Sequence, residues 1–384
     1  MLPLPLTLSD DALRYLWDGK VALAGFNPYA LPPADPELAP LRDENWRILP
    51  HVEVPTVYPP LSVAAFSIAS RLPFPILAWK LLVTAADLGT CALLLRLARR
   101  RGIPEGRIAW YAWNPLVALE VSGMGHVDAL GVAATVGAVL ALSQVRTLSA
   151  TAWSSATWSA AGALAKLVPL AALPMWSRQS GRPGRFLGTA AVLLAAAGLP
   201  VVASVGGIPP GLLTYGVSWE FNGPVYEPLW RLLDATGAAP WIARGLEALE
   251  RRTEMWYAWD WIYPYLYPQL LAKLLLAAGM AAVVLRSLRE TDPVTGTGRL
   301  FGRLLLLSAT VYPWYLLWVL PWAALTRNRA WLALSGLILL SYLTLMSVPL
   351  WPWVYLGIWV PFAIVFFAAR GWAEAPSPPA RGRG

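Results

Sequence analysis

The sequence predicts an all-α, polytopic integral membrane protein with about 10 or 11 membrane helices, some of them short or broken. Three observations lead to this prediction. The 384 residues are 57% hydrophobic and only 14% charged, whereas soluble domains carry roughly 25% charged residues. Long apolar runs recur along the chain, and arginines gather in the short segments between them. The 22 Trp and 35 Pro residues fit interfacial aromatic belts and interrupted helices.

The apolar runs set the expected topology. The run at 75–98 leads into the strongest basic cluster of the chain, which marks the cytoplasmic side. Residues 1–57 are therefore expected outside the cytoplasm, and the short apolar piece at 58–72 is expected to dip into the membrane or lie flat. The remaining runs are 108–124, 126–144, 150–177, 186–205, 264–288, 300–326, 330–348 and 352–370.

Two of these runs, 150–177 and 300–326, are expected to fold as two short helices each. Only then do all basic loops fall on the cytoplasmic side. The breaks are placed at Lys166 to Pro169 and at Tyr312-Pro313-Trp314, where they would leave a wet cavity on the outer side. The alternative is one long tilted helix per run, which puts two basic loops on the wrong side.

One membrane domain, residues 1–371, is expected to carry two extracytoplasmic loops that close over this cavity. The first loop is 1–57. The second is 206–263, which is rich in Trp, Tyr and Pro and has a helical patch near 238–255. Residues 372–384 are expected to form a disordered cytoplasmic tail.

A pair of aspartates near the start of the chain, Asp10 and Asp11, is the first candidate for chemistry. In the functional interpretation, one carboxylate takes a proton from an acceptor hydroxyl, a role that contributes ~10²–10⁴-fold to a rate. The structural alternative is a helix N-cap, supplied by Ser9 or Asp10 ahead of a helical stretch. Asp18 lies two helical turns beyond Asp11, so it can share the same face.

A second polar group is expected at the outer end of a helical hairpin, where His126 and Asp128 stand two residues apart. These side chains could bind sugar hydroxyls or a phosphate, and helix capping by Asp128 is an equal alternative. Lys166 falls at the break predicted in 150–177. A lysine in a membrane span snorkels to the surface unless it lines a cavity, so we expect Lys166 to contact a phosphate or a sugar.

The remaining candidate residues lie in two segments that are rich in aromatic residues. Glu220 and Asn222 lie among aromatic residues of the second loop, a composition that suits carbohydrate binding and equally an interfacial belt. The aromatic residues at the second break could form a ceiling over the cavity or an interfacial girdle. The predicted catalytic residues are Asp11 and Asp10, and the predicted substrate-binding residues are Arg14, Tyr15, Asp18, Tyr58, His126, Asp128, Lys166, Glu220, Asn222, Trp314 and Tyr315.

Several short motifs stand in a fixed order along most of the chain. They are Ser9-Asp10-Asp11, Arg14-Tyr15, Trp17-Asp18-Gly19, Asn27-Pro28-Tyr29, Tyr58-Pro59-Pro60, Trp79-Lys80, Asp87-Leu88, Trp113-Asn114-Pro115-Leu116, Gly125-His126, Asp128, Lys166, Pro169, Pro313-Trp314-Tyr315, Trp318 and Pro321. Together they resemble the GT-C glycosyltransferases, integral membrane enzymes that use polyprenyl-phosphate sugars. More narrowly, the chain is similar to bacterial polyprenyl-phosphate-mannose-dependent mannosyltransferases and, distantly, to the catalytic subunit of GPI mannosyltransferase I.

The resemblance implies an acidic catalytic base in the first extracytoplasmic loop, a position that Asp11 matches best, with Asp10 beside it. It also implies an inverting transfer of a sugar, with mannose as the first choice, from a lipid phosphate donor to a hydroxyl. The lipid phosphate is the leaving group, so a nearby cation would stabilise its developing charge. The candidates for that contact are Arg14, Arg47, Lys166 and Lys273.

The expected partners are a polyprenyl-phosphate sugar donor, a glycan, glycolipid or other hydroxyl acceptor, and membrane lipids. Nucleic acid is not expected, because the arginines behind the +8 charge lie in short loops. The resemblance implies the bacterial inner membrane, with the active site outside the cytoplasm. The sequence establishes no cofactor: the paired aspartates permit a divalent metal, but no further ligand set is visible to support one.

Two other classes of function remain as alternatives. A polytopic transporter or lipid flippase would carry ionisable residues at mid-membrane and repeated halves. Here the acidic cluster lies outside the predicted spans and no repeat is visible. A structural scaffold of an envelope-synthesis complex would need none of the acidic residues for its role.

Overall fold

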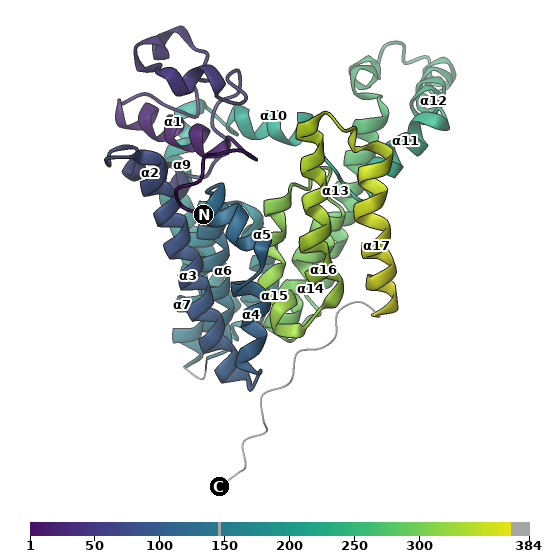
Figure 1. Ribbon diagram of the computed structural model, residues 1–384. Helices are drawn as coiled ribbons and strands as arrows, with labels where there is room; N and C mark the ends of the chain where they lie inside the picture. The colour runs from purple at the N-terminus through teal and green to yellow at the C-terminus, as the bar shows by residue number, and fades with distance from the viewer. Residues whose placement is uncertain (145–146, 370–384) are drawn as a thin grey trace.

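The computed structural model describes residues 1–144 and 147–369, which fold into helices joined by loops (Figure 1). The tail expected at 372–384 lies outside these residues. Within the described residues, five helical segments are long and apolar enough to cross a membrane. They are α3 (Pro75–Arg101), α9 (Pro183–Val205), α13 (Pro268–Ser287), Arg329–Met346 and Leu350–Ala368. The predicted all-α, polytopic membrane architecture is thereby confirmed, although the other expected spans are shorter or divided.

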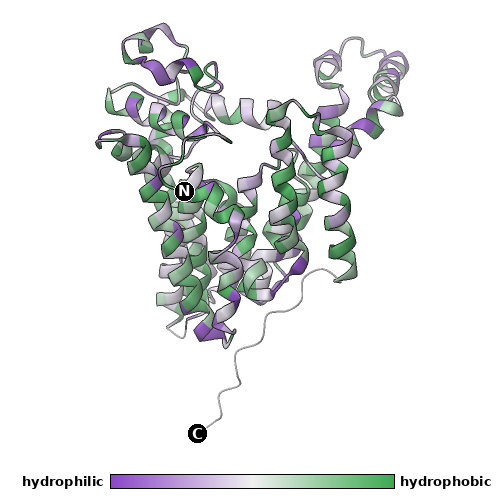
Figure 2. Ribbon diagram, viewed as in Figure 1, coloured by the Kyte–Doolittle hydropathy of each residue, from purple (hydrophilic) through white to green (hydrophobic). Residues whose placement is uncertain are grey.

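Two groups of helices stand side by side and diverge toward the end where α1 lies (Figure 1). In the first group, α3 packs on α6 (Asp128–Leu142), α6 on α7 (Leu148–Ala165), and α7 on α9. The second group consists of α13, α14 (Pro293–Leu306), α15 (Leu320–Thr326), α16 (Arg329–Leu337) with η8 (Ile338–Met346), and η9 (Leu350–Val354) with α17 (Tyr355–Ala368). Buried apolar side chains of both groups form one core. Apolar residues also cover the outer flanks (Figure 2), as a lipid-embedded surface requires.

Two regions of short helices lie beyond the diverging ends, at the top of Figure 1. The first contains α1 (Asp11–Leu23), η1 (Pro36–Leu41), η2 (Glu44–Ile48) and α2 (Pro60–Ser70). The second contains α10 (Pro210–Ser218), α11 (Tyr226–Ala235), α12 (Ala238–Thr253) and η6 (Asp260–Tyr265). The helix expected near 238–255 is therefore confirmed. The 11 residues of α2 reach about 16 Å, well short of a ~30 Å hydrocarbon core, so α2 does not cross it.

The two divided runs predicted from the sequence are confirmed. The first run becomes α7, η5 (Val168–Ala172) and α8 (Leu173–Gln179), with Lys166 in an extended conformation at the break. The second becomes α14, η7 (Pro313–Trp318) and α15, with an extended residue before Pro313. Proline disfavours a helical conformation in the preceding residue and cannot donate a ladder hydrogen bond. Both breaks therefore bring irregular backbone into the interior, where a cavity can form.

The run at 108–124 is also divided, which the sequence analysis does not anticipate. Its parts are η3 (Glu105–Ile108), α4 (Ala109–Ala112), α5 (Pro115–Val117) and η4 (Ala118–Gly123). The side chain of Asn114 accepts a hydrogen bond from the Leu116 amide at 3.0 Å and starts a new turn beside Pro115. The last part, η4, is a π-helical turn. Such turns occur frequently at functional sites, and this one carries Glu120.

The basic segments meet at the end of the molecule opposite α1 and α12 (Figure 1). There Arg101 is paired with Asp292, and Arg107 donates a hydrogen bond to the carbonyl of Leu325 at 2.8 Å. These contacts join segments that the topology prediction assigns to one side of the membrane. The orientation of that side toward the cytoplasm stays a prediction.

Candidate functional site

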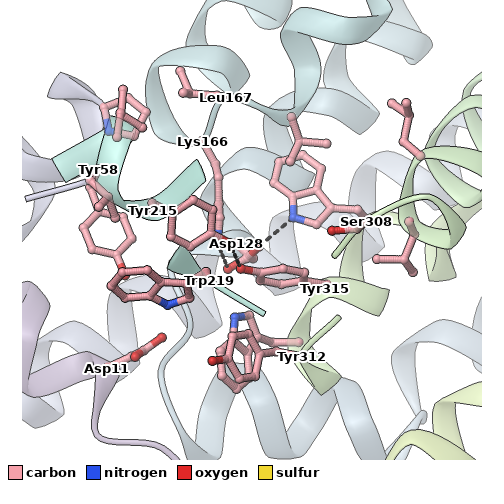
Figure 3. A pocket seen from close by; sticks show the side chains of 18 of the residues that line it. Asp11, Tyr58, Asp128, Lys166, Leu167, Tyr215, Trp219, Ser308, Tyr312 and Tyr315 are labelled. Atoms are coloured by element: carbon pink, nitrogen blue, oxygen red, sulfur yellow. Dashed lines mark hydrogen bonds and ion pairs between the residues drawn. The ribbon is translucent and has the colours of Figure 1, made fainter. Parts of the chain in front are cut away.

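The two breaks and the two regions of short helices meet around a cavity of about 770 Å³ (Figure 3). Its lining comes from the segment before α1, the loop at 50–59, η5, α10, η7 and the inner sides of α13 and α14. The predicted site residues that line it are Asp10, Asp11, Arg14, Tyr58, Asp128, Lys166, Trp314 and Tyr315. Residues as far apart in the sequence as Asp10 and Tyr315 are thus gathered around one space.

Asp11 is the first residue of α1, and its side chain faces the cavity (Figure 3). The carboxylate is 27% exposed. Its Oδ2 atom accepts a hydrogen bond from the Tyr15 hydroxyl at 3.3 Å and lies 3.7 Å from Nδ1 of His126. Its Oδ1 atom accepts no hydrogen bond from the residues that the structure describes. One oxygen of Asp11 is therefore held while the other is left open to a ligand.

Asp10 occupies the N-cap position of α1, but its side chain makes no capping hydrogen bond. The alternative prediction, that Ser9 or Asp10 caps the helix, holds in part for Ser9. Its Oγ accepts a hydrogen bond from the Asp11 amide at 3.3 Å. Asp10 is open to water on one side and enclosed by the cavity wall on the other. This desolvation raises the pKa of the Asp10 carboxyl above its ordinary value, and the charge of Asp11 adds to the increase. The two neighbouring carboxylates therefore differ in environment.

The second polar centre of the cavity is an ion pair between Asp128 and Lys166. The Lys166 ammonium lies 2.8 Å from Oδ2 of Asp128, and the indole of Trp318 donates to Oδ1 at 2.6 Å. Asp128 is fully buried, whereas the lysine side chain is 20% exposed. An ammonium has three donors, and the carboxylate uses one of them. The exposed part of Lys166 can therefore present further donors to an anion in the cavity.

Aromatic rings form much of the remaining cavity wall. The hydroxyls of Tyr215 and Tyr315 are hydrogen-bonded to one another, and the Lys166 ammonium lies 5.1 Å from the centre of the Tyr315 ring. Tyr312 stacks on Trp314 with ring centres 4.5 Å apart. Flat aromatic faces with a few hydroxyls suit a sugar ring, whose C–H face is apolar and whose edge is polar.

Arg14 lines the cavity, but its guanidinium is already engaged by protein groups. Its Nε donates to Asp18 at 2.9 Å, and its two terminal nitrogens donate to the carbonyls of His51 at 2.8 Å and Val54 at 2.5 Å. Burial raises the pKa of the Asp18 carboxyl, and the charge of Arg14 opposes that increase. Arg14 thus ties the 50–59 loop to α1, beside Asp11.

Several predicted residues lie outside the cavity lining. Tyr15 and Asp18 are buried within α1. His126 is fully buried and stacks on Trp314, with ring centres 3.9 Å apart. Each of these side chains contacts a residue of the lining without facing the open space.

The predicted second-loop residues lie farther from the cavity. Glu220 forms an ion pair of 2.8 Å with Lys273. The buried side chain of Asn222 accepts a hydrogen bond from the Trp359 indole at 2.8 Å. Arg47 lies exposed on η2. None of these four predicted residues lines the described cavity.

Sequence reasoning missed two pairings at this site. Trp318 was expected as part of a ceiling or girdle, yet it donates directly to Asp128. Tyr342 was not singled out, yet its hydroxyl lies 2.8 Å and 3.0 Å from the two carboxylate oxygens of Glu120. A glutamate inside an apolar run is costly unless it is paired, and this is the signal that could have prompted a search for its partner. Among the described residues, no cluster of three or more His, Cys, Asp or Glu could hold a metal ion.

Two glycines of α10 provide a test of how this helix is seated over the cavity. A methyl group on Gly211 would lie 2.4 Å from the carbonyl oxygen of Pro55, while one on Gly216 would meet nothing within 4 Å. In a helix, Gly→Ala alone stabilises by roughly 0.5–1 kcal/mol, and overpacking costs about 1–3 kcal/mol. We expect Gly211→Ala to lower the apparent melting temperature and Gly216→Ala to leave it equal or higher. Thermal unfolding followed by Trp fluorescence checks this, and equal shifts would contradict the close seating of α10.

Residues 1–178 match a family model, the MptA_B family, described as alpha-(1->6)-mannopyranosyltransferase, N-terminal domain. The match includes Asp11, His126, Asp128 and Lys166 but ends before α10 and η7. No curated protein and no solved structure matches the chain. The N-terminal part of the chain is therefore similar to this mannosyltransferase family.

Proposed function

We propose that the protein is a membrane glycosyltransferase that transfers mannose from a polyprenyl-phosphate-mannose donor to a hydroxyl of an acceptor, with inversion at the anomeric carbon. The similarity of residues 1–178 to a mannosyltransferase family supports a glycosyltransferase that acts on mannose. The lipid-linked donor, the inversion and the role of Asp11 go beyond that similarity and rest on the residues of the cavity.

One observation carries the proposal: a carboxylate with a free oxygen and a partly exposed ammonium line separate walls of the same cavity, with aromatic faces between them (Figure 3). Asp11 supplies the carboxylate, and Lys166 supplies the ammonium. Transfer from a sugar phosphate needs both groups. A base must deprotonate the acceptor hydroxyl, and a positive charge must stabilise the departing phosphate. The ring of Tyr315 and the edge of Trp314, whose two faces are covered by His126 and Tyr312, can contact the sugar between them.

The proposed reaction moves one proton and exchanges one bond. Oδ1 of Asp11 removes the proton from the acceptor hydroxyl, and the oxygen of that hydroxyl bonds to the anomeric carbon of mannose. The bond from the anomeric carbon to the phosphate oxygen breaks, and its electron pair stays on the phosphate. Lys166 stabilises the additional negative charge of the departing polyprenyl phosphate. Asp11 then releases its proton to water.

A lipid-linked donor suits the apolar part of the lining. Met280 and Val284 of α13 and Leu304 of α14 line the cavity next to its polar centre. On the outer side of α13, Leu274 and Leu285 are exposed, as expected for a helix in contact with lipid. A polyprenyl chain could therefore extend between α13 and α14 toward the bilayer while its phosphate stays near Lys166.

The test is transfer by the purified protein in lipid nanodiscs, with radiolabelled polyprenyl-phosphate-mannose as donor and a synthetic alkyl mannoside as acceptor. We expect a labelled disaccharide whose new linkage is of the opposite anomer to the donor. GDP-mannose serves as the control donor and should give no product. Transfer from GDP-mannose but not from the lipid donor would overturn the proposal, and retention of the anomer would overturn the single-displacement step.

A further inference from the structure

A row of four polar side chains, Asp11, His126, Glu120 and Tyr342, leads from the cavity into the helix bundle, and the two in the middle are buried. Nδ1 of His126 lies 3.7 Å from Oδ2 of Asp11, and Nε2 of the same ring lies 3.2 Å from Oε2 of Glu120. The hydroxyl of Tyr342 donates to Glu120 at 2.8 Å and 3.0 Å. These residues come from α1, the turn before α6, η4 and η8, so four parts of the chain converge on this row.

Placing charged and polar side chains inside the helix bundle costs free energy unless they interact with one another. His126 and Glu120 both have 0% exposed side chains. A buried carboxylate loses several kcal/mol of hydration, which only close partners can replace. Neither ring nitrogen of His126 makes a full hydrogen bond among the described residues, and the contact of Nδ1 with Asp11 is long at 3.7 Å. Catalytic hydrogen bonds are often long or poorly aligned in the absence of substrate and tighten when it binds.

The His126 ring is held in place from its face as well as from its nitrogens. It stacks on Trp314 at an interplanar angle of 14°, and Trp314 stacks in turn on Tyr312 at 2°. Glu120 lies on the π-helical turn η4, which directs its carboxylate toward the ring from the opposite side of the row. The ring therefore has little freedom to turn away from Asp11.

We propose that His126, oriented by Glu120 and Tyr342, is a positioning residue that fixes Asp11 for its role as the base. The inference rests on the proposed function, whose base it supports. His126 and Tyr15 both face Oδ2 of Asp11. They fix the carboxylate plane and leave Oδ1 directed at the acceptor hydroxyl. A base that is misplaced by 1 Å can cost ~10²-fold in rate, which is the advantage of such a support.

The other titratable groups around Asp11 do not supply the same support. Asp10 carries a like charge, and the hydroxyls of Tyr58, Tyr312 and Tyr215 are phenols that stay neutral near pH 7. On its other side, His126 faces Glu120. Among these neighbours, the ring nitrogens of His126 are the groups that can stabilise the Asp11 carboxylate by a charge-assisted hydrogen bond. Loss of those nitrogens should therefore leave the Asp11 carboxylate less firmly oriented.

The experiment compares His126→Phe, Glu120→Gln and Tyr342→Phe with the wild-type chain in the transfer assay. His126→Phe keeps a ring for the stack on Trp314 but removes both nitrogens. We expect it to lower kcat by ~10²-fold and to leave the KM for the donor unchanged. Glu120→Gln and Tyr342→Phe should lower kcat by smaller factors. Adding Glu120→Gln to His126→Phe should cause little further loss, because both changes act through one row.

Three results would overturn this positioning role. They are wild-type kcat in His126→Phe, a loss that falls on the donor KM and not on kcat, and losses that multiply in the double variant. Asp11→Asn is measured in parallel: if it retains full transfer, the assigned base is wrong and the positioning role fails with it. If only the His126 variants retain transfer, the proposed function stands and the inference fails. A structure of His126→Phe gives a readout independent of activity, since the inference predicts that Asp11 loses its contact with Tyr15 while Trp314 stays in place.

Discussion

Asp11→Asn is expected to lower kcat for mannose transfer by ~10²–10⁴-fold while leaving donor binding unchanged. The amide has nearly the same shape as the carboxylate and can still contact the Tyr15 hydroxyl, so the fold of α1 should persist. It cannot take a proton from the acceptor, however, because an amide oxygen is a very weak base. Transfer rates at saturating donor, with donor binding measured separately, check both parts of this prediction.

Asp10→Asn is the matched control, since it changes the neighbouring residue in the same way. Asp10 also lines the cavity but contacts neither His126 nor Tyr15 in the part of the chain that the structure describes. We expect a loss of less than about tenfold from the removed charge. Loss of transfer in Asp10→Asn with activity retained in Asp11→Asn would move the base by one residue and contradict the assignment made here.

Lys166→Met is expected to lower kcat/KM by ~10²–10³-fold, the range seen when one group that stabilises developing charge is removed. The change also leaves the buried carboxylate of Asp128 without its cation, which destabilises the protein. A double variant, Lys166→Met with Asp128→Asn, removes both charges and should regain stability. It should not regain activity, because the contact to the departing phosphate is still missing. Unfolding temperatures and kcat/KM separate the two effects.

Lys273→Met provides the control for a general loss of positive charge. Lys273 is paired with Glu220 and lies outside the cavity lining. We expect its replacement to change kcat/KM by less than about threefold, as for an ion pair remote from the reacting atoms. A larger loss in Lys273→Met than in the double variant at Lys166 and Asp128 would assign the phosphate contact to Lys273 on α13 instead.

The sequence predicts the fold well where one residue type, such as proline, determines the local backbone conformation. Pro313 and the segment from Lys166 to Pro169 were enough to divide two runs, and both breaks are present. The break within 108–124 was not predicted, although Asn114-Pro115 is a common way to end one helical turn and begin another. The expected side of the membrane and the two loops as extracytoplasmic regions stay predictions.

Several residues of the site could be predicted from the sequence, but their arrangement in space could not. Asp11, Asp128 and Lys166 were chosen separately, and all three line the cavity. Their partners come from distant positions: Trp318 lies 190 residues from Asp128, and Tyr342 lies 222 residues from Glu120. No local pattern indicates such pairs, because packing between helices creates them. Glu220 and Asn222 were predicted from their aromatic neighbours, a composition that suits sugar binding, but neither lines the cavity. Glu220 forms an ion pair, and the buried amide of Asn222 accepts a hydrogen bond.

The most direct test of the account is a structure of the wild-type protein in nanodiscs with polyprenyl-phosphate-mannose bound and no acceptor added. We expect the phosphate within hydrogen-bond distance of the Lys166 ammonium, the mannose against Trp314 and Tyr315, and Asp11 on the side of the anomeric carbon away from the phosphate. The polyprenyl chain should leave between α13 and α14. A phosphate held by Lys273 or Arg47, or a mannose bound outside this cavity, would contradict the central claim.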